Sequence, residues 1–128
     1  MTADGKIKNF SDLVVWQEAH RLVLLVYLIT KSFPRDEIYG LSSQLRRAAV
    51  SITSNIAEGF ARFHYKDKLN FYYDSRGSLS EVENQMIIAR DLSYLSPNEF
   101  LKVKEGIGKV SVILNGLIQK TRIMSESK

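Results

Sequence analysis

A stripe of apolar residues at helical spacing runs through residues 41–60 and restricts the fold more than any other feature of the chain. Its members fall three or four positions apart, which places them on one face of an α-helix: Leu41, Leu45, Ala48, Ala49, Ile52, Ile56 and Phe60. The opposite face holds mainly small residues: Ser43, Arg47, Val50, Ser51, Ser54, Ala57 and Glu58. Because small side chains let a second helix approach closely, the pattern favours a helix packed on two sides, one within the subunit and one between subunits.

Three more segments have the pattern of helices, at about residues 11–31, 65–95 and 97–122. Ser11 or Asp12 can cap the first of these helices, because a short polar side chain accepts hydrogen bonds from the first helical turn. Pro34 disfavours helix at the residue before it, so the first helix must end there. Gly59 marks the expected end of the helix that follows.

The last two helices show both a core stripe and a clear start signal. The stripe of the third helix contains Phe71, Ser75, Ser78, Leu79, Val82, Met86 and Ala89. Ser96, Pro97 and Glu99 then form a capping box with proline at the first helical position. The fourth helix continues with apolar spacings of four and three, which are typical of a bundle seam: Val103, Ile107, Val110, Leu114, Leu117 and Thr121.

These four helices and their short connections predict an all-α fold, because no segment of any length has the β period. Short connections favour antiparallel neighbours, so we expect an up-down-up-down four-helix bundle. The 128 residues suffice for one domain with one core. We expect a flexible N-terminal tail at 1–10, the bundle at 11–122, and a frayed C-terminal tail at 123–128.

The first helix has apolar residues all round, and a helix of that kind must be buried all round. Three neighbouring helices cannot enclose it fully, so the leftover surface predicts self-association; the alternative is a monomer with an unusually apolar helix. The residues that we assign to the subunit interface come from the first helix and from the small-residue face of the second: Leu22, Leu25, Leu28, Ile29, Ser43, Val50, Ser54 and Ala57.

Most forms of catalytic and metal chemistry find no support in the sequence. The absence of cysteine excludes disulfides, zinc–thiolate sites and thiol nucleophiles. The Glu-x-x-His pairs of di-iron bundles are missing, as are a nucleophile elbow and a phosphate-binding loop. His20 lies on an apolar stripe, which favours a structural role, and His64 falls in a turn. We therefore expect a protein that is not an enzyme and that holds no metal or cofactor.

Neither membrane insertion nor secretion is indicated. The longest apolar run, at 22–29, is far shorter than the roughly 20 residues that span a bilayer. The N-terminus has no signal-peptide pattern. We expect a cytoplasmic protein.

Most of the excess of basic over acidic residues lies in the middle of the chain. The formal net charge is +4, and residues 40–80 hold six basic residues against three acidic ones. Such a surface favours polyanions, and an aromatic between cations can stack on a base. The residues that we assign to contacts with RNA or DNA are Arg46, Arg47, Arg62, Lys66, Lys68, Tyr73 and Arg76.

Two plainer interpretations remain open for these residues. Lys66, Tyr73 and Arg76 lie on a face of the third helix that can simply be solvated. A stripe on the second helix can be a polar seam that fixes the register of packed helices; its members are Arg47, Ser51, Ser54 and Glu58.

Three stretches of the sequence together are typical of one protein family: DLVVWQEAH at 12–20, YGLSSQLRRAA at 39–49, and SNIAEG at 54–59. The chain resembles the bacterial four-helix proteins encoded within intervening sequences of 23S ribosomal RNA genes, also labelled S23 ribosomal proteins. The similarity extends from about Asp12 to Arg122. One departure is Thr53, because family members often have proline before the SNIAEG run.

This resemblance implies an antiparallel four-helix bundle that assembles as a homopentamer and has no established enzymatic activity. The accessory variability proteins of diversity-generating retroelements look similar in fold, and they form basic pentameric barrels that bind nucleic acid and a reverse transcriptase. Our leading hypothesis is therefore a non-catalytic homo-oligomer that binds RNA or DNA through a basic surface. The alternative is an oligomeric scaffold or adaptor that binds another protein and has no nucleic-acid role.

Overall fold

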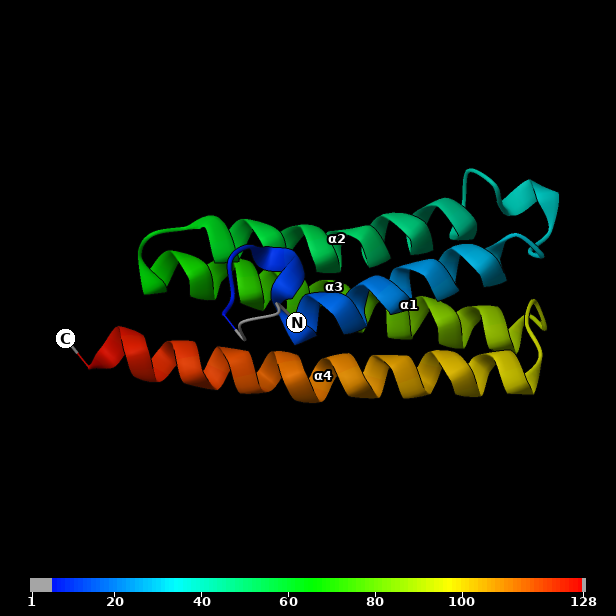
Figure 1. Ribbon diagram of the computed structural model, residues 1–128. Helices are drawn as coiled ribbons and strands as arrows, with labels where there is room; N and C mark the ends of the chain where they lie inside the picture. Colours follow the sequence, from blue (N-terminus) through cyan, green and yellow to red (C-terminus); the bar gives the residue numbers. More distant parts are fainter. Residues whose placement is uncertain (1–5, 128) are drawn as a thin grey trace.

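Four long helices lie side by side and run alternately in opposite directions (Figure 1). The computed structural model describes residues 6–127. Each helix packs on the next along the chain, and the fourth returns to contact the first. Within the described residues there is no β-strand. The elements are η1 (Phe10–Asp12), α1 (Val14–Thr30), η2 (Arg35–Glu37), α2 (Leu41–Ala61), α3 (Tyr65–Asp91) and α4 (Pro97–Glu126). This arrangement confirms the all-α, up-down four-helix fold.

The core lies along the axis of the bundle, where the apolar stripes of the four helices meet. The stripe of α2 is buried from Leu45 to Ile56, as the periodicity predicts. One prediction for α1 is wrong: Leu22 and Ile29, which we assigned to a subunit interface, are only 1% and 3% exposed within a single chain. They point toward the bundle axis because α1 packs against both α2 and α4. Leu25 is half-buried, and Leu28 remains exposed.

The start of α1 differs from the sequence prediction. Leu13, not Ser11 or Asp12, is the N-cap residue of α1, because both polar residues lie in the preceding turn η1. Asn9 caps that turn, and the Asp12 carboxylate accepts hydrogen bonds from the backbone of residues 8 and 9. Of the flexible tail expected at 1–10, residues 1–5 lie outside the described residues, and residues 9 and 10 belong to the capped turn.

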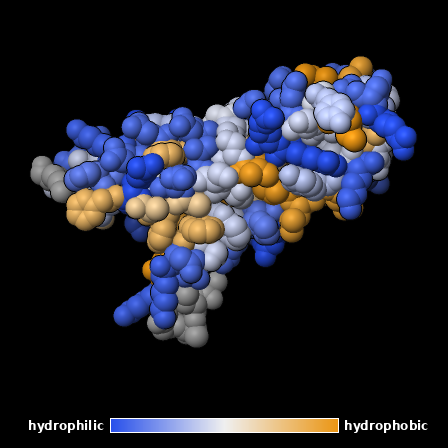
Figure 2. Space-filling model, turned by 90° about the horizontal axis from the view of Figure 1, so that it is seen from above, coloured by the Kyte–Doolittle hydropathy of each residue, from blue (hydrophilic) through white to orange (hydrophobic). Residues whose placement is uncertain are grey.

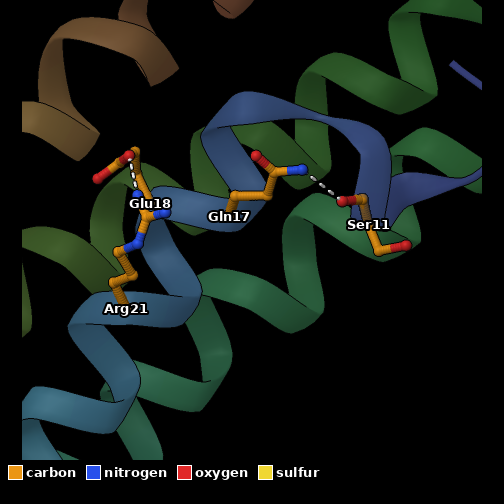
Figure 3. A network of polar contacts seen from close by, with 4 residues as sticks. All are labelled: Ser11, Gln17, Glu18 and Arg21. Carbon is orange, nitrogen blue, oxygen red and sulfur yellow. Dashed lines mark hydrogen bonds and ion pairs between the residues drawn. The ribbon is translucent and has the colours of Figure 1, made fainter. Parts of the chain in front are cut away.

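A side-chain hydrogen bond fastens η1 to α1. The Gln17 amide donates to the backbone carbonyl of Ser11 at 3.0 Å, and Glu18 pairs with Arg21 one turn further on (Figure 3). The direction of the chain entering the bundle is thus fixed by the first two turns of α1.

The ends of the other helices also shift from their expected positions. Helix α2 continues through Gly59 to Ala61, and α3 ends at Asp91 instead of near residue 95. Ser93 has a φ of 63°, the left-handed conformation that commonly follows a helix end. The capping box of Ser96 and Glu99 is present. Helix α4 extends to Glu126, so the first residues of the C-terminal tail expected at 123–128 are helical; Lys128 lies outside the described residues.

Helices α2 and α3 make the closest contact in the bundle, and small residues create it. The Ser75 hydroxyl donates to the Ile52 carbonyl at 2.8 Å, and the Ser78 hydroxyl donates to that of Ser51 at 2.8 Å. The ring of Tyr72 lies directly over Gly59, where an added Cβ would be 2.6 Å from the Tyr72 Cε1 atom. Ser51 therefore belongs to a packing seam, whereas Ser54 at the other end of that stripe is exposed.

We predict that Gly59→Ala lowers the free energy of unfolding by about 1–3 kcal/mol, because the new methyl group forces α2 and α3 apart. Gly77→Ala is the matched control, since a Cβ at this exposed helical position meets no atom within 4 Å. It should raise stability by up to about 1 kcal/mol. Urea denaturation of the two variants measures both effects, and equal stability of the two would contradict the role given to Gly59.

The Glu37 carboxylate links the α1–α2 connection to the α3–α4 connection at one end of the bundle. It accepts from the backbone N–H of Leu41 at 3.0 Å and from the Tyr94 hydroxyl at 2.8 Å. The first bond supplies an acceptor to the start of α2, and the second reaches the α3–α4 connection. The bonds from Leu41 and then Tyr94 lower the pKa of Glu37 below its ordinary value of 4.5.

A carboxyl group whose pKa is lowered by folding stabilises the protein above its unfolded-state pKa and loses this effect as pH falls through the folded-state value. We therefore predict that Glu37→Gln is less stable than the wild type at neutral pH. The difference should shrink as the solution is acidified below pH 4.5. Urea denaturation across this range measures it, with Glu81→Gln as a control for the loss of one negative charge. A difference independent of pH would show that the carboxylate charge is irrelevant here.

Candidate nucleic-acid interface

The residues assigned to nucleic-acid contacts fall into three separate places. Arg46 and Arg47 lie on α2 close to its start, beside the end of α1. Tyr73 and Arg76 lie in the middle of α3, next to α4. Arg62, Lys66 and Lys68 gather at the α2–α3 connection, which is at the other end of α2 (Figure 1).

The third group surrounds a hollow in the surface, which we call the α2–α3 hollow. It has a volume of about 610 Å³ and is formed by the end of α2, the start of α3 and the last turn of α4. Its lining residues are Arg62, Phe63, His64, Tyr65, Lys66, Asp67, Lys68 and Ser125. The hollow therefore brings together three of the predicted basic residues from a short stretch of chain.

Phe63 stands out in this hollow, and the sequence analysis did not single it out. Its side chain is 88% exposed although it is a large apolar group. The ring of His64 meets it edge-on, with the two ring centres 5.0 Å apart. The sequence does show an aromatic residue between Arg62 and His64 in the segment that joins two helices. Such a segment has no helical periodicity, so the sequence pattern does not indicate whether the side chain is exposed.

Arg62 is held at the rim of the hollow. Its guanidinium lies over the ring of Phe71, 4.6 Å from the ring centre, and its Nη2 atom is 3.4 Å from the Glu58 carboxylate. The side chains of both partners in this ion pair are about half exposed, so the pair contributes little to stability. The charge of Arg62 thus stays at the surface in a restricted position, where it can meet an anion.

Lys68 has a structural role that the sequence did not reveal. Its Nζ atom donates to the carbonyls of Phe60 at 2.8 Å and Gly59 at 3.3 Å, both in the last turn of α2, where helix carbonyls lack the usual intrahelical partner. Partial burial lowers the pKa of Lys68. Lys66, in the first turn of α3, is exposed. Of the two lysines, Lys66 is therefore the better placed to contact an external phosphate.

The prediction that Tyr73 points away from the core is wrong. Tyr73 is half-buried and packs against the core, because α4 lies close to this part of α3. Arg76 lies over its ring, 5.2 Å from the ring centre, and donates to the side-chain oxygen of Asn115 at 3.0 Å. One face of the Tyr73 ring is therefore already occupied.

Of the two arginines near the start of α2, Arg46 is held by neighbouring side chains and Arg47 is exposed. The Arg46 Nε atom donates to the Thr30 hydroxyl at 2.8 Å, and its guanidinium lies 5.0 Å from the ring centre of Tyr27. Arg47 is exposed on the same side of α2. Both line a shallow depression with Ile38 and Val50.

The described part of the chain shows neither a metal site nor a membrane-spanning helix. Among residues 6–127, no group of three or more histidine, aspartate or glutamate side chains is arranged to hold a metal ion. Over the same range, none of the helices combines the length and apolar character needed to cross a membrane. His20 is half-buried and stacks on Trp16 at 4.7 Å between ring centres.

Comparison with known proteins supports the resemblance noted in the sequence. Residues 11–116 match the family described as 23S rRNA-intervening sequence protein. The chain belongs to this family. No curated protein matches the chain.

A solved structure has the same fold. It is a protein of unknown function from the S23 ribosomal protein family of Bacteroides thetaiotaomicron VPI-5482, with 17% sequence identity and a TM-score of 0.76. The alignment covers 82% of this chain and 98% of that one. At this identity the likeness establishes the four-helix fold of the 23S rRNA-intervening sequence protein and nothing about its ligands.

Proposed function

We propose that this 23S rRNA-intervening sequence protein is a cytoplasmic, non-catalytic homo-oligomer, a pentamer, that binds RNA or DNA through basic surfaces. The α2–α3 hollow carries the proposal. It combines the cations Arg62 and Lys66 with an exposed aromatic ring, and cations neutralise phosphates while aromatic rings stack on bases.

Self-association is supported by apolar side chains that a single subunit leaves uncovered. Leu24 and Leu28 lie one turn apart on the outer face of α1, and Val50 lies on α2 across from Tyr27; all four are exposed. Figure 2 shows the molecule from above, and hydrophobic patches interrupt the hydrophilic surface along the bundle. A contact between subunits would remove such side chains from water. The count of five rests on the family resemblance.

Assembly and nucleic-acid binding support each other in this proposal. One hollow offers few charges, and its affinity for a flexible strand is expected to be low. Several copies in one particle convert later contacts along the strand into intramolecular ones and raise the overall affinity.

We predict that the wild-type protein has a solution mass of five times the 14.6 kDa of one chain. Leu28→Glu should shift it toward smaller species, because a carboxylate would be buried at the contact. Leu101→Glu is the matched control: Leu101 is 55% exposed against 62% for Leu28 but lies on α4. Light scattering coupled to size-exclusion chromatography measures the mass. Dissociation by the control alone would place the contact on α4.

We predict that Arg62→Gln combined with Lys66→Gln weakens RNA binding and flattens its dependence on salt. Losing two phosphate contacts should reduce the slope of log affinity against log salt by roughly 1.5. The charge-matched control is Arg35→Gln with Lys102→Gln, which removes two exposed cations at the opposite end of the bundle. Gel-shift titrations with structured ribosomal RNA at about 50 mM and about 200 mM salt give the slopes.

Two outcomes would contradict the nucleic-acid proposal. One is the absence of binding by the wild type at low salt. The other is an equal effect of the two double variants, which would mean that only the net charge matters. A partner protein captured equally with and without nuclease would instead favour the scaffold, for which the exposed Leu101 and Val112 of α4 offer a surface.

A further inference from the structure

We infer that the α2–α3 hollow binds single-stranded nucleic acid in preference to duplex, with one unpaired base stacked on the ring of Phe63. This inference rests on the proposed function, because it names the form of nucleic acid that the same site accepts.

Phe63 is the outlier among the phenylalanines of the described chain. Phe33 is buried, and Phe10 is 37% exposed and packs on Trp16. The other three are half-buried: Phe60, Phe71 and Phe100. Phe63 is in the short connection between α2 and α3 and does not belong to the core or to the side chains packed on it. The apolar surface of the Phe63 ring therefore does not pack against the core of the subunit and is available to a ligand.

The position of Phe63 is well defined even though its side chain is exposed. The connection comprises only the residues between Ala61 and Tyr65, so both neighbouring helices hold it. The start of the connection is restrained by the Arg62 N–H, which donates to the carbonyl of Gly59 at 3.2 Å. A ring that is both exposed and anchored loses little conformational freedom when a base stacks on it.

Cations lie on both sides of this ring along the chain. Arg62 directly precedes Phe63, and Lys66 follows in the first turn of α3. A strand that places a base on the ring can therefore place its phosphates toward these side chains. Stacking with nearby charges is the arrangement by which proteins bind single strands without strong sequence preference.

A duplex uses this site less well. Its bases are already stacked on one another, and it offers phosphates to the cations but no free base face to Phe63. Duplex binding would then depend on Arg62 and Lys66 alone. The volume of about 610 Å³ lies within the range of ordinary ligand pockets, so an unpaired nucleotide can enter it.

Tyr39 provides an internal comparison. It is 95% exposed, in the α1–α2 connection at the opposite end of the bundle. Its neighbours in η2 include the carboxylates Asp36 and Glu37, which repel phosphate. Exposure of an aromatic ring therefore occurs at both ends. The hollow around Phe63 is lined by the cations Arg62, Lys66 and Lys68 and by one carboxylate, Asp67, whereas η2 holds one cation, Arg35, with two carboxylates.

The test uses the full-length protein and fluorescence anisotropy with a labelled RNA of about 12 nucleotides, either single-stranded or annealed to its complement. A DNA strand of the same sequence distinguishes RNA from DNA as the source of the ligand. The variants are Phe63→Leu, which removes the aromatic face, Phe63→Trp, which keeps one, and Tyr39→Leu as the matched control. Circular dichroism and light scattering check fold and assembly.

The wild type should bind the single strand more tightly than the duplex. Phe63→Leu should weaken single-strand binding by about 5- to 100-fold, the range expected for one stacked base, and leave duplex binding unchanged. Phe63→Trp should retain the wild-type preference, and Tyr39→Leu should have no effect.

Failure of this inference can be told apart from failure of the proposed function. Equal binding of single strand and duplex, with no effect of Phe63→Leu, overturns the stacking inference while nucleic-acid binding stands. No binding of either form at low salt overturns both. Displacement of the RNA by polyglutamate at the same charge concentration, from wild type and Phe63→Leu alike, shows a general anion surface and also overturns the inference.

Discussion

The close approach of α2 and α3 is the constraint on which the rest of the bundle depends. A glycine beneath the Tyr72 ring and two buried serines let the two backbones come together, and the serine hydroxyls are satisfied by partners on α2. A buried hydroxyl without a partner would be costly, so these bonds permit one register and disfavour others. That register sets where α2 ends, where α3 begins, and hence where the connection between them projects.

Helical periodicity was enough to predict the fold, since most residues of the α2 stripe and of the α4 seam are buried as their spacing requires. Leu117 is an exception, because it is half-buried and the neighbouring Ile118 is buried instead. The helix ends were harder, because they depend on competing local bonds. Asn9 caps the separate turn η1, which contains Ser11, so Ser11 does not cap α1. Gly59 lies inside α2, where it allows close contact with Tyr72, and does not end the helix. The burial of Leu22 and Ile29 shows a further limit: a helix that is apolar on all sides does not reveal which side faces the axis.

The candidate site could be predicted only in part, for a related reason. The sequence identifies Arg62, Lys66 and Lys68 as basic. It cannot show that the Lys68 ammonium group donates hydrogen bonds to carbonyls in the last turn of α2. It also cannot show that Arg76 lies over Tyr73. Periodicity gives the face of a residue relative to its own helix, while availability to a ligand depends on neighbouring helices. Phe63 lies in a connection, where no periodicity exists.

The length of α4 has a consequence for how this family can diversify. The match to the family ends at residue 116, whereas α4 runs on to Glu126 and contributes Ser125 to the wall of the α2–α3 hollow. One lining residue of the hollow thus lies beyond the matched segment. Substitutions in those final turns can reshape the opening and its charge while the α2–α3 contact stays intact. The shape and charge of this hollow can therefore change at the tip of one helix, independently of the architecture that supports it.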